Sequence, residues 1–145
     1  MKTESVQKLW DIKHHLSLSC YEHSMFVAYM SYCAARKLGL DHVAAARAGL
    51  LHDLYLYESH KTSWLRHYFT HASHALANAR KLCDLSRQEE NIILAHMWPL
   101  SGAMPRSWEA LVVSLCDKYC AVIEGLHIWH RMKIRLRMPA SCPTI

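Results

Sequence analysis

The feature that most restricts how this chain can fold is a series of helix-start signals along its length. Ser19 and Ser86 are each followed three residues later by a glutamate, a capping box in which the two side chains satisfy free amides of the first helical turn. Asp41 is a third candidate cap. Glycine and proline are scarce, with four of each in 145 residues, so little interrupts the helices. The sequence therefore predicts an all-α domain.

The apolar pattern between these signals predicts a single compact bundle of about five to six helices. In the first helix, Phe26, Met30 and Ala34 recur at helical spacing on one stripe, and Gly39 suits a left-handed helix stop. The helices that the pattern defines best cover residues 20–38, 42–54, 71–83, 87–96 and 107–124. Residues 55–69 have aromatic and charged side chains but no clean period, so we predict a loop with a short turn there.

The positive charge is concentrated after the last predicted helix. The formal net charge is +5, but Glu124 is the last acidic residue and four basic residues follow it, at positions 131, 133, 135 and 137. Without these four charges the net charge is +1, which argues against a dedicated nucleic-acid groove. We predict a helical domain at residues 1–126 and a basic C-terminal tail at residues 127–145. Residues 131–138 alternate basic and apolar side chains, which indicates a strand or an irregular arm.

The cysteines and the N-terminal residues bear on the compartment. None of the six cysteines forms a C-x-x-C pair, and most lie in apolar, helical surroundings. Residues 1–10 lack the apolar stretch of a secretory signal, so we expect a cytoplasmic protein with reduced thiols. Cys116 and Cys120 lie one turn apart on a predicted helix and are interpreted as packing residues. We expect no membrane span, because no apolar run approaches the ~20 residues that cross a bilayer.

The chain has twelve histidines, a number that makes metal binding more probable than in an average protein. The informative ones lie beside apolar stripes. His23 precedes Phe26 by about one turn and His96 follows Ile92 by one turn, so both should face the core. Taken alone, each such histidine is more often a hydrogen-bonded core residue than a metal ligand.

Two further sites strengthen the case for a metal. Asp117 lies in LVVSLCDKYCAVI, and a bare carboxylate in such apolar surroundings is strongly unfavourable. It either reaches Lys118 or a distant base, or it binds a metal, and we favour the metal. His52 and Asp53 follow an apolar run at a predicted helix end, where the partial negative charge of the helix favours a cation. A carboxylate beside an imidazole can bridge two ions while the imidazole holds one.

These residues together resemble a known family. An isolated histidine in YEHSMFVAYMS, a His-Asp pair in AAARAGLLHDLYLY and a distant aspartate in LCDKYCA resemble the signature of the HD-domain phosphohydrolase superfamily. Histidines in THASHALANARKL and IILAHMWPL are similar to the extended pattern of its two-metal members. The resemblance covers residues 19–124, and five matching pieces in family-like order are more specific than any one of them.

The resemblance implies a metal site carried by residues 1–126. It implies that one ion is held by His23, His52, Asp53 and Asp117. Asp53 would bridge to a second ion held by His71 and His96. His74 is the rival of His71, which we prefer because Ala75 gives a small residue four positions later, as in the family. Imidazole and carboxylate ligands suit one or two divalent ions of iron, manganese, cobalt or zinc better than magnesium or calcium.

The superfamily mostly hydrolyses phosphoesters, so we predict a metal-dependent phosphohydrolase acting on a small nucleotide or a related phosphate compound. Asp53 and Lys118 are the candidate catalytic residues. Arg47 and Lys118 are the candidate contacts to the substrate phosphate, although either can be a structural or surface charge. The chain between the predicted ligands 52 and 96 is short, which favours a small substrate or a site completed by a second subunit of a homo-oligomer.

Two other functions stay open on the sequence alone. Some superfamily members use the same six ligands to hold two irons and activate oxygen on a small organic substrate. A non-catalytic helical binding module is the third possibility, and the intact ligand set argues against it.

Overall fold

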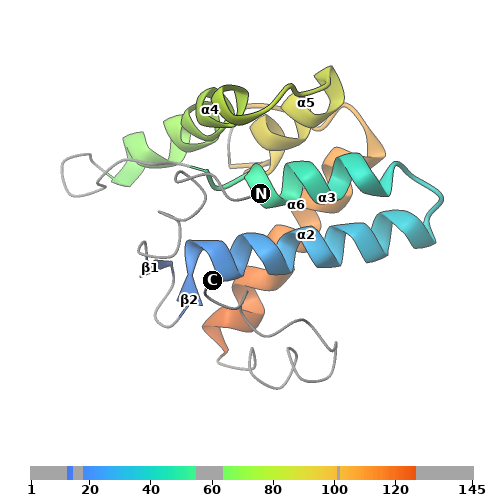
Figure 1. Ribbon diagram of the computed structural model, residues 1–145. Helices are drawn as coiled ribbons and strands as arrows, with labels where there is room; N and C mark the ends of the chain where they lie inside the picture. Colours follow the sequence, from blue (N-terminus) through green and yellow to red (C-terminus); the bar gives the residue numbers. More distant parts are fainter. Residues whose placement is uncertain (1–12, 15–17, 55–63, 101, 127–145) are drawn as a thin grey trace, which may run out of the picture.

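The computed structural model describes residues 13–14, 18–54, 64–100 and 102–126. Two short strands, β1 (Lys13–His14) and β2 (Leu18–Ser19), pair antiparallel, with Lys13 opposite Ser19 and His14 opposite Leu18. The helices of the described part are α2 (Cys20–Lys37), α3 (His42–Leu51), α4 (Trp64–Leu82), α5 (Arg87–Ala95) and α6 (Trp108–Gly125). The predicted all-α class is confirmed (Figure 1).

The helices α2 and α3 run antiparallel, side by side, and form the most extensive helix pair (Figure 1). Their close approach depends on Gly49, where an added Cβ would lie 3.2 Å from the Cα of Ala28 on α2. Helix α6 packs against α2, α3 and α5, and α4 packs mainly on α5. The ends of α3 and α5 therefore lie near α2, α4 and α6, and this meeting point holds the site described below.

The predicted helix starts at Asp41 and Ser86 are confirmed by their cap geometry, whereas α3 ends at Leu51, three residues before the predicted end at residue 54, with His52 as its C-cap. Asp41 accepts hydrogen bonds from the amides of Val43 (3.1 Å) and Ala44 (2.9 Å) at the start of α3. Ser86 and Glu89 form both halves of the capping box of α5, with distances of 3.1 and 2.7 Å. Gly39 has a φ of 70° at the end of α2, a conformation that suits glycine because it lacks a Cβ.

The start of α4 differs from the prediction. The helix was expected from residue 71, but it begins at Trp64, inside the segment predicted to be a loop. The physical reason is that no glycine or proline lies between Trp64 and Leu82, so nothing stops the helix from extending back through an irregular run of aromatic and charged residues. Residues 55–63 lie outside the described part of the chain. So does the predicted tail at 127–145, including the alternating run at 131–138.

The core is built from apolar side chains of α2, α3, α4, α5 and α6 and from Leu54, which follows α3; Phe26, Leu54, Ile92 and Ile93 are fully buried. Cysteines in the described chain are free thiols, and two of them, Cys20 and Cys120, belong to this core. No helix in the described ranges has both the length and the apolar character that a membrane crossing requires.

Candidate metal centre

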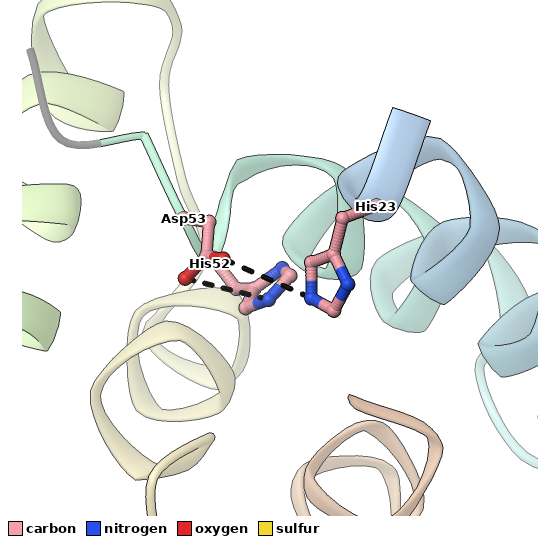
Figure 2. Close-up of side chains that lie close together, drawn as sticks. All are labelled: His23, His52 and Asp53. Carbon is pink, nitrogen blue, oxygen red and sulfur yellow. Dashed lines mark ion pairs between the residues drawn. The ribbon is translucent and has the colours of Figure 1, made fainter. Parts of the chain in front are cut away.

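The six residues predicted as metal ligands converge from five helices. His23 lies in the first turns of α2, His71 within α4 and Asp117 within α6. His52 and His96 are the C-terminal caps of α3 and α5, and Asp53 directly follows the first of these. Figure 2 shows His23 and the His52–Asp53 pair pointing toward one another from α2 and the end of α3.

The carboxylate of Asp53 lies at the centre of this group. Its Oδ1 is 2.7 Å from Nε2 of His71, 3.5 Å from Nε2 of His52 and 3.7 Å from Nε2 of His96. Its Oδ2 is 3.8 Å from Nε2 of His23. One carboxylate thus lies within 3.8 Å of a nitrogen of each of four imidazoles.

Asp117 supplies the second carboxylate. Its Oδ1 lies 3.1 Å from Nε2 of His23 and 3.4 Å from Nε2 of His52. Of the alternatives open for this carboxylate, a neighbouring lysine, a distant base or a metal, its contacts among the described residues include two distant bases, His23 and His52. Potential ligand atoms lie within 4.8 Å of one another in three groups: His23, His52 and Asp53; His52, His96 and Asp117; and Asp53, His71 and His96.

Backbone hydrogen bonds to the Nδ1 atoms of His52 and His96 fix the orientation of these two rings. Nδ1 of His52 lies 2.7 Å from the carbonyl oxygen of Gly49, and Nδ1 of His96 lies 2.7 Å from that of Ile93. A carbonyl oxygen only accepts hydrogen bonds, so Nδ1 donates in both rings. In the neutral ring, Nε2 is then a lone-pair donor that points inward, which is the usual arrangement of a metal-binding histidine.

The Nε2 atoms of His52 and His96 test whether a metal ion fits between the side chains. Nε2 of His52 and Nε2 of His96 are buried and have no hydrogen-bond partner among the described residues. An unpaired buried polar atom costs about 1–3 kcal/mol, and here two of them face carboxylate oxygens instead of donors. A cation between the imidazoles and the carboxylates would satisfy both kinds of atom. The donor set therefore fits a divalent metal ion.

The pKa values of His23 and His96 are shifted in opposite directions. Burial opposes a charged imidazole at His23, but hydrogen bonds with Asp117 and Glu124 outweigh it and raise the His23 pKa to about 10. Burial, reinforced by the positive charge of His52, lowers the pKa of His96 to about 4. Burial also favours the neutral form of Asp117, yet the hydrogen bond with His23 and the nearby imidazole of His52 hold the Asp117 pKa far below its ordinary value.

The structure distinguishes the two histidines of α4 that the sequence left as rivals. His71 is buried and lies against Asp53, whereas His74 is exposed. His71 is therefore the member of the pair that joins the cluster.

The two predicted substrate-binding cations make other contacts. The ammonium of Lys118 donates to the carbonyl oxygens of His96 (3.0 Å) and Ser114 (3.1 Å) and to the Ser114 hydroxyl (2.7 Å). These bonds tie α6 to the turn that carries His96. Arg47 pairs with Glu89 at 2.9 Å and donates to the carbonyl oxygen of Asp84, which joins α3 to the start of α5.

Sequence reasoning missed Glu124, which lies two turns after Asp117 on α6. Its Oε1 accepts a hydrogen bond from Nδ1 of His23 at 2.7 Å, and the residue is 1% exposed. The signal that pointed to Asp117 was also present here, since both are acidic residues in a nearly continuous apolar helix. A spacing of seven residues further indicates that both lie on the same helix face.

Comparison with known families agrees with this geometry. The family model of the HD domain matches residues 20–122, and the chain therefore belongs to the HD-domain family. Members of this family are mostly metal-dependent hydrolases. No solved structure shows significant similarity to the chain.

Proposed function

We propose that this chain is a phosphohydrolase that cleaves a phosphoester bond of a small nucleotide or a related phosphate compound. The observation that supports the proposal best is the position of Asp53, whose Oδ1 lies 2.7 Å from Nε2 of His71 and whose Oδ2 lies 3.8 Å from Nε2 of His23. In this proposal one ion is held by His23, His52, Asp53 and Asp117, and a second by Asp53, His71 and His96. Iron, manganese, cobalt and zinc suit these donors.

Bound divalent ions supply hydroxide from a coordinated water and neutralise charge on a phosphoryl oxygen. The chain itself orients the ligands and limits the access of solvent. The carbonyl oxygens of Gly49 and Ile93 hold two imidazoles in the tautomer that metal binding needs. With 14% of its side chain exposed, Asp117 is the most open of the six ligands. We therefore place the approach of the substrate on the Asp117 side, with Asp53 as the central catalytic ligand.

Lys118 and Arg47 are proposed to contact the substrate phosphate at the edge of the site. Lys118 is the better placed of the two, because it adjoins Asp117 in sequence and its ammonium lies 3.0 Å from the carbonyl oxygen of His96. Binding a phosphate would require Lys118 to exchange one of its three present hydrogen bonds. Arg47 would have to leave Glu89, so its contribution should be smaller.

The test is hydrolysis of a panel of nucleotides and other small phosphoesters by the full chain, purified without added metal and then supplied with manganese or iron. Elemental analysis of the same preparation reports the metal content. The matched variants are His71→Ala and His74→Ala, which remove a buried and an exposed histidine from the same helix. We expect His71→Ala to lose activity and metal, and His74→Ala to keep both.

Phosphoester cleavage no greater than that of an Asp53→Ala variant, across the panel and with each metal, would refute the proposal. Oxygen consumption by the iron-loaded protein in that case would favour a di-iron oxygenase instead. Absence of copurified metal together with absence of both activities would favour a helical binding module.

A further inference from the structure

The outward face of α6 carries a row of apolar side chains at strict spacing. The row, called here the α6 stripe, consists of Trp108, Val112, Leu115, Tyr119, Val122 and Leu126. Successive members are separated by four, three, four, three and four residues, which is the spacing of a coiled-coil seam. Trp108 is 70% exposed, Leu115 58%, Tyr119 47%, Val122 59% and Leu126 63%. Leu126 continues the last turn, since its amide bonds to the carbonyl oxygen of Val122.

Among the described residues, no charged side chain of α6 belongs to this stripe, although a helix that faces water normally has charged or polar residues on its outer side. The four charged residues of α6 all bond within the molecule. Glu109 accepts from the amide of Asp41, Asp117 and Glu124 pair with His23, and Lys118 donates to the turn after α5. The outward face of α6 therefore has no charged side chain of its own with which to select a partner, and an apolar surface suits it best.

The stripe is also symmetric along the helix. Positions 108 and 126, 112 and 122, and 115 and 119 are equally distant from position 117. Two α6 helices packed antiparallel about a two-fold axis at this position would place Trp108 on Leu126, Val112 on Val122 and Leu115 on Tyr119, each contact occurring twice. Such self-complementarity is what an interface between identical subunits requires. We propose that the α6 stripe is the interface with a second copy of this chain.

The two ends of the stripe also match in shape. A hollow of about 340 Å³ adjoins the start of α6; its walls are mainly apolar, with Trp98, Met104, Pro105, Trp108 and Leu111, and also include Arg106 and Ser107. The antiparallel arrangement brings the partner's Leu126 to this end, where it can pack against the apolar walls. The exposed fractions of the stripe and of Met104 correspond to roughly 700 Å² of apolar surface, close to the ~800 Å² that each partner contributes to a standard interface.

The first test is the molar mass of the full chain by light scattering and sedimentation at 1–100 μM, for which we expect twice the mass of one chain. Leu115→Glu places a charge beside the two-fold axis and should raise the dimer dissociation constant at least 100-fold. Leu38→Glu is the matched control, because Leu38 at the end of α2 is equally exposed and lies outside the stripe. It should leave the dimer intact.

A monomeric wild-type chain, or a dimer that Leu115→Glu leaves unchanged, would overturn the proposal. A monomer whose melting temperature falls in Leu115→Glu would show that another part of the same chain covers the stripe, and the proposal would again fail.

The second test addresses the antiparallel register. Leu115→Cys and Tyr119→Cys proteins are mixed, allowed to exchange subunits and oxidised with oxidised glutathione. We expect a covalent dimer between the two variants. We expect none when Leu115→Cys is mixed with Trp108→Cys, because position 108 of the partner lies ~16 Å along the helix from position 119, which faces Leu115. Crosslinking in the second mixture but not in the first would overturn the register.

Discussion

His23 and His96 occupy equally buried positions in one cluster, each 1% exposed, yet their protonation is opposite. The pKa of His23 is raised to about 10 and that of His96 is lowered to about 4. The difference comes from the groups around each ring: His23 is hydrogen-bonded to the carboxylates of Asp117 and Glu124, whereas Nδ1 of His96 meets the carbonyl oxygen of Ile93 and the positive charge of His52 lies nearby. Burial alone would lower both values, so the local charge decides which form each ring takes.

This contrast divides the centre into a His23 side, which also contains Asp117 and Glu124, and a His96 side, which also contains His71. The His23 side has an excess of acidic groups and retains a proton when no cation is bound. On the other side, the lowered pKa of His96 keeps its ring neutral, so that Nε2 offers a lone pair. Asp53 lies near histidines of both sides. We therefore expect a substitution of Asp53 to weaken metal binding on both sides, whereas a substitution of His96 or Glu124 should change one side.

The largest expected effect is therefore that of Asp53→Asn, which keeps the size of the side chain but removes its charge. We expect loss of the bound metal and a fall in kcat/KM of at least 1,000-fold, because both proposed ions lose a shared ligand. Elemental analysis and hydrolysis assays measure the two effects. An Asp84→Asn variant is the control, since Asp84 adjoins α5 outside the cluster. Retention of metal at the wild-type level would contradict the bridging position.

The position of Asp53 also shows what sequence could and could not predict. The helix starts at Asp41 and Ser86 followed from local patterns, because caps depend on neighbours within a few residues. Local patterns also singled out His23, His96, Asp117 and the His52–Asp53 pair, whereas the full set of six, including His71, followed from the resemblance to the HD-domain family. The hydrogen bond between Glu124 and His23 joins residues 101 positions apart, and no local pattern encodes such a pairing. The early start of α4 at Trp64 was missed because the apolar residues there have no helical period, although no glycine or proline stops the helix.

A second prediction concerns the pH dependence of stability on the His96 side. The folded-state pKa of His96 is about 4 and the ordinary value is 6.5, so below pH 6.5 the unfolded chain binds a proton that the folded chain does not. The metal-free protein should therefore lose up to about 3 kcal/mol of stability as the pH falls from 6.5 to 4. His23 adds no change in this window, since its raised pKa keeps it protonated in the folded state and its stabilisation is complete below pH 6.5.

Urea unfolding of the metal-free protein across that pH range measures how the free energy of unfolding changes with pH. A His96→Asn variant should lose most of the acid-dependent decrease, and His74→Asn should keep it. An equal slope in all three proteins would show that His96 is not the residue responsible. On the His23 side the sign is reversed: its contribution to stability should disappear as the pH rises toward 10, where the folded-state His23 loses its proton.

A third prediction concerns the negative charge of Glu124, which lies beside Nδ1 of His23. Glu124→Gln keeps a hydrogen-bond acceptor for Nδ1 of His23 but removes the negative charge, so the pKa of His23 should fall. Changes to outer partners of metal ligands typically weaken metal binding 10–100-fold, and we expect an effect in that range. Titration of the metal-free protein by NMR follows the His23 pKa, and competition with a chelating dye follows zinc affinity. Glu90→Gln is a suitable control, since Glu90 pairs with Arg80 on the surface. A variant with unchanged His23 pKa and zinc affinity would remove Glu124 from the centre.

The smallest effects are expected from the two cations at the edge of the site, and they differ in kind. Lys118→Met should raise KM several-fold with a smaller change in kcat if the ammonium contacts substrate phosphate, because uniform binding is lost. Arg47→Met should instead cost about 1 kcal/mol of stability with little change in KM, because the ion pair with Glu89 joins α3 to α5 and Arg47 is half exposed. Steady-state kinetics and urea unfolding of both variants separate these outcomes. A change in stability without a change in KM for Lys118→Met would reduce that residue to the support of the His96 turn, and the substrate phosphate would then depend on the metal centre alone.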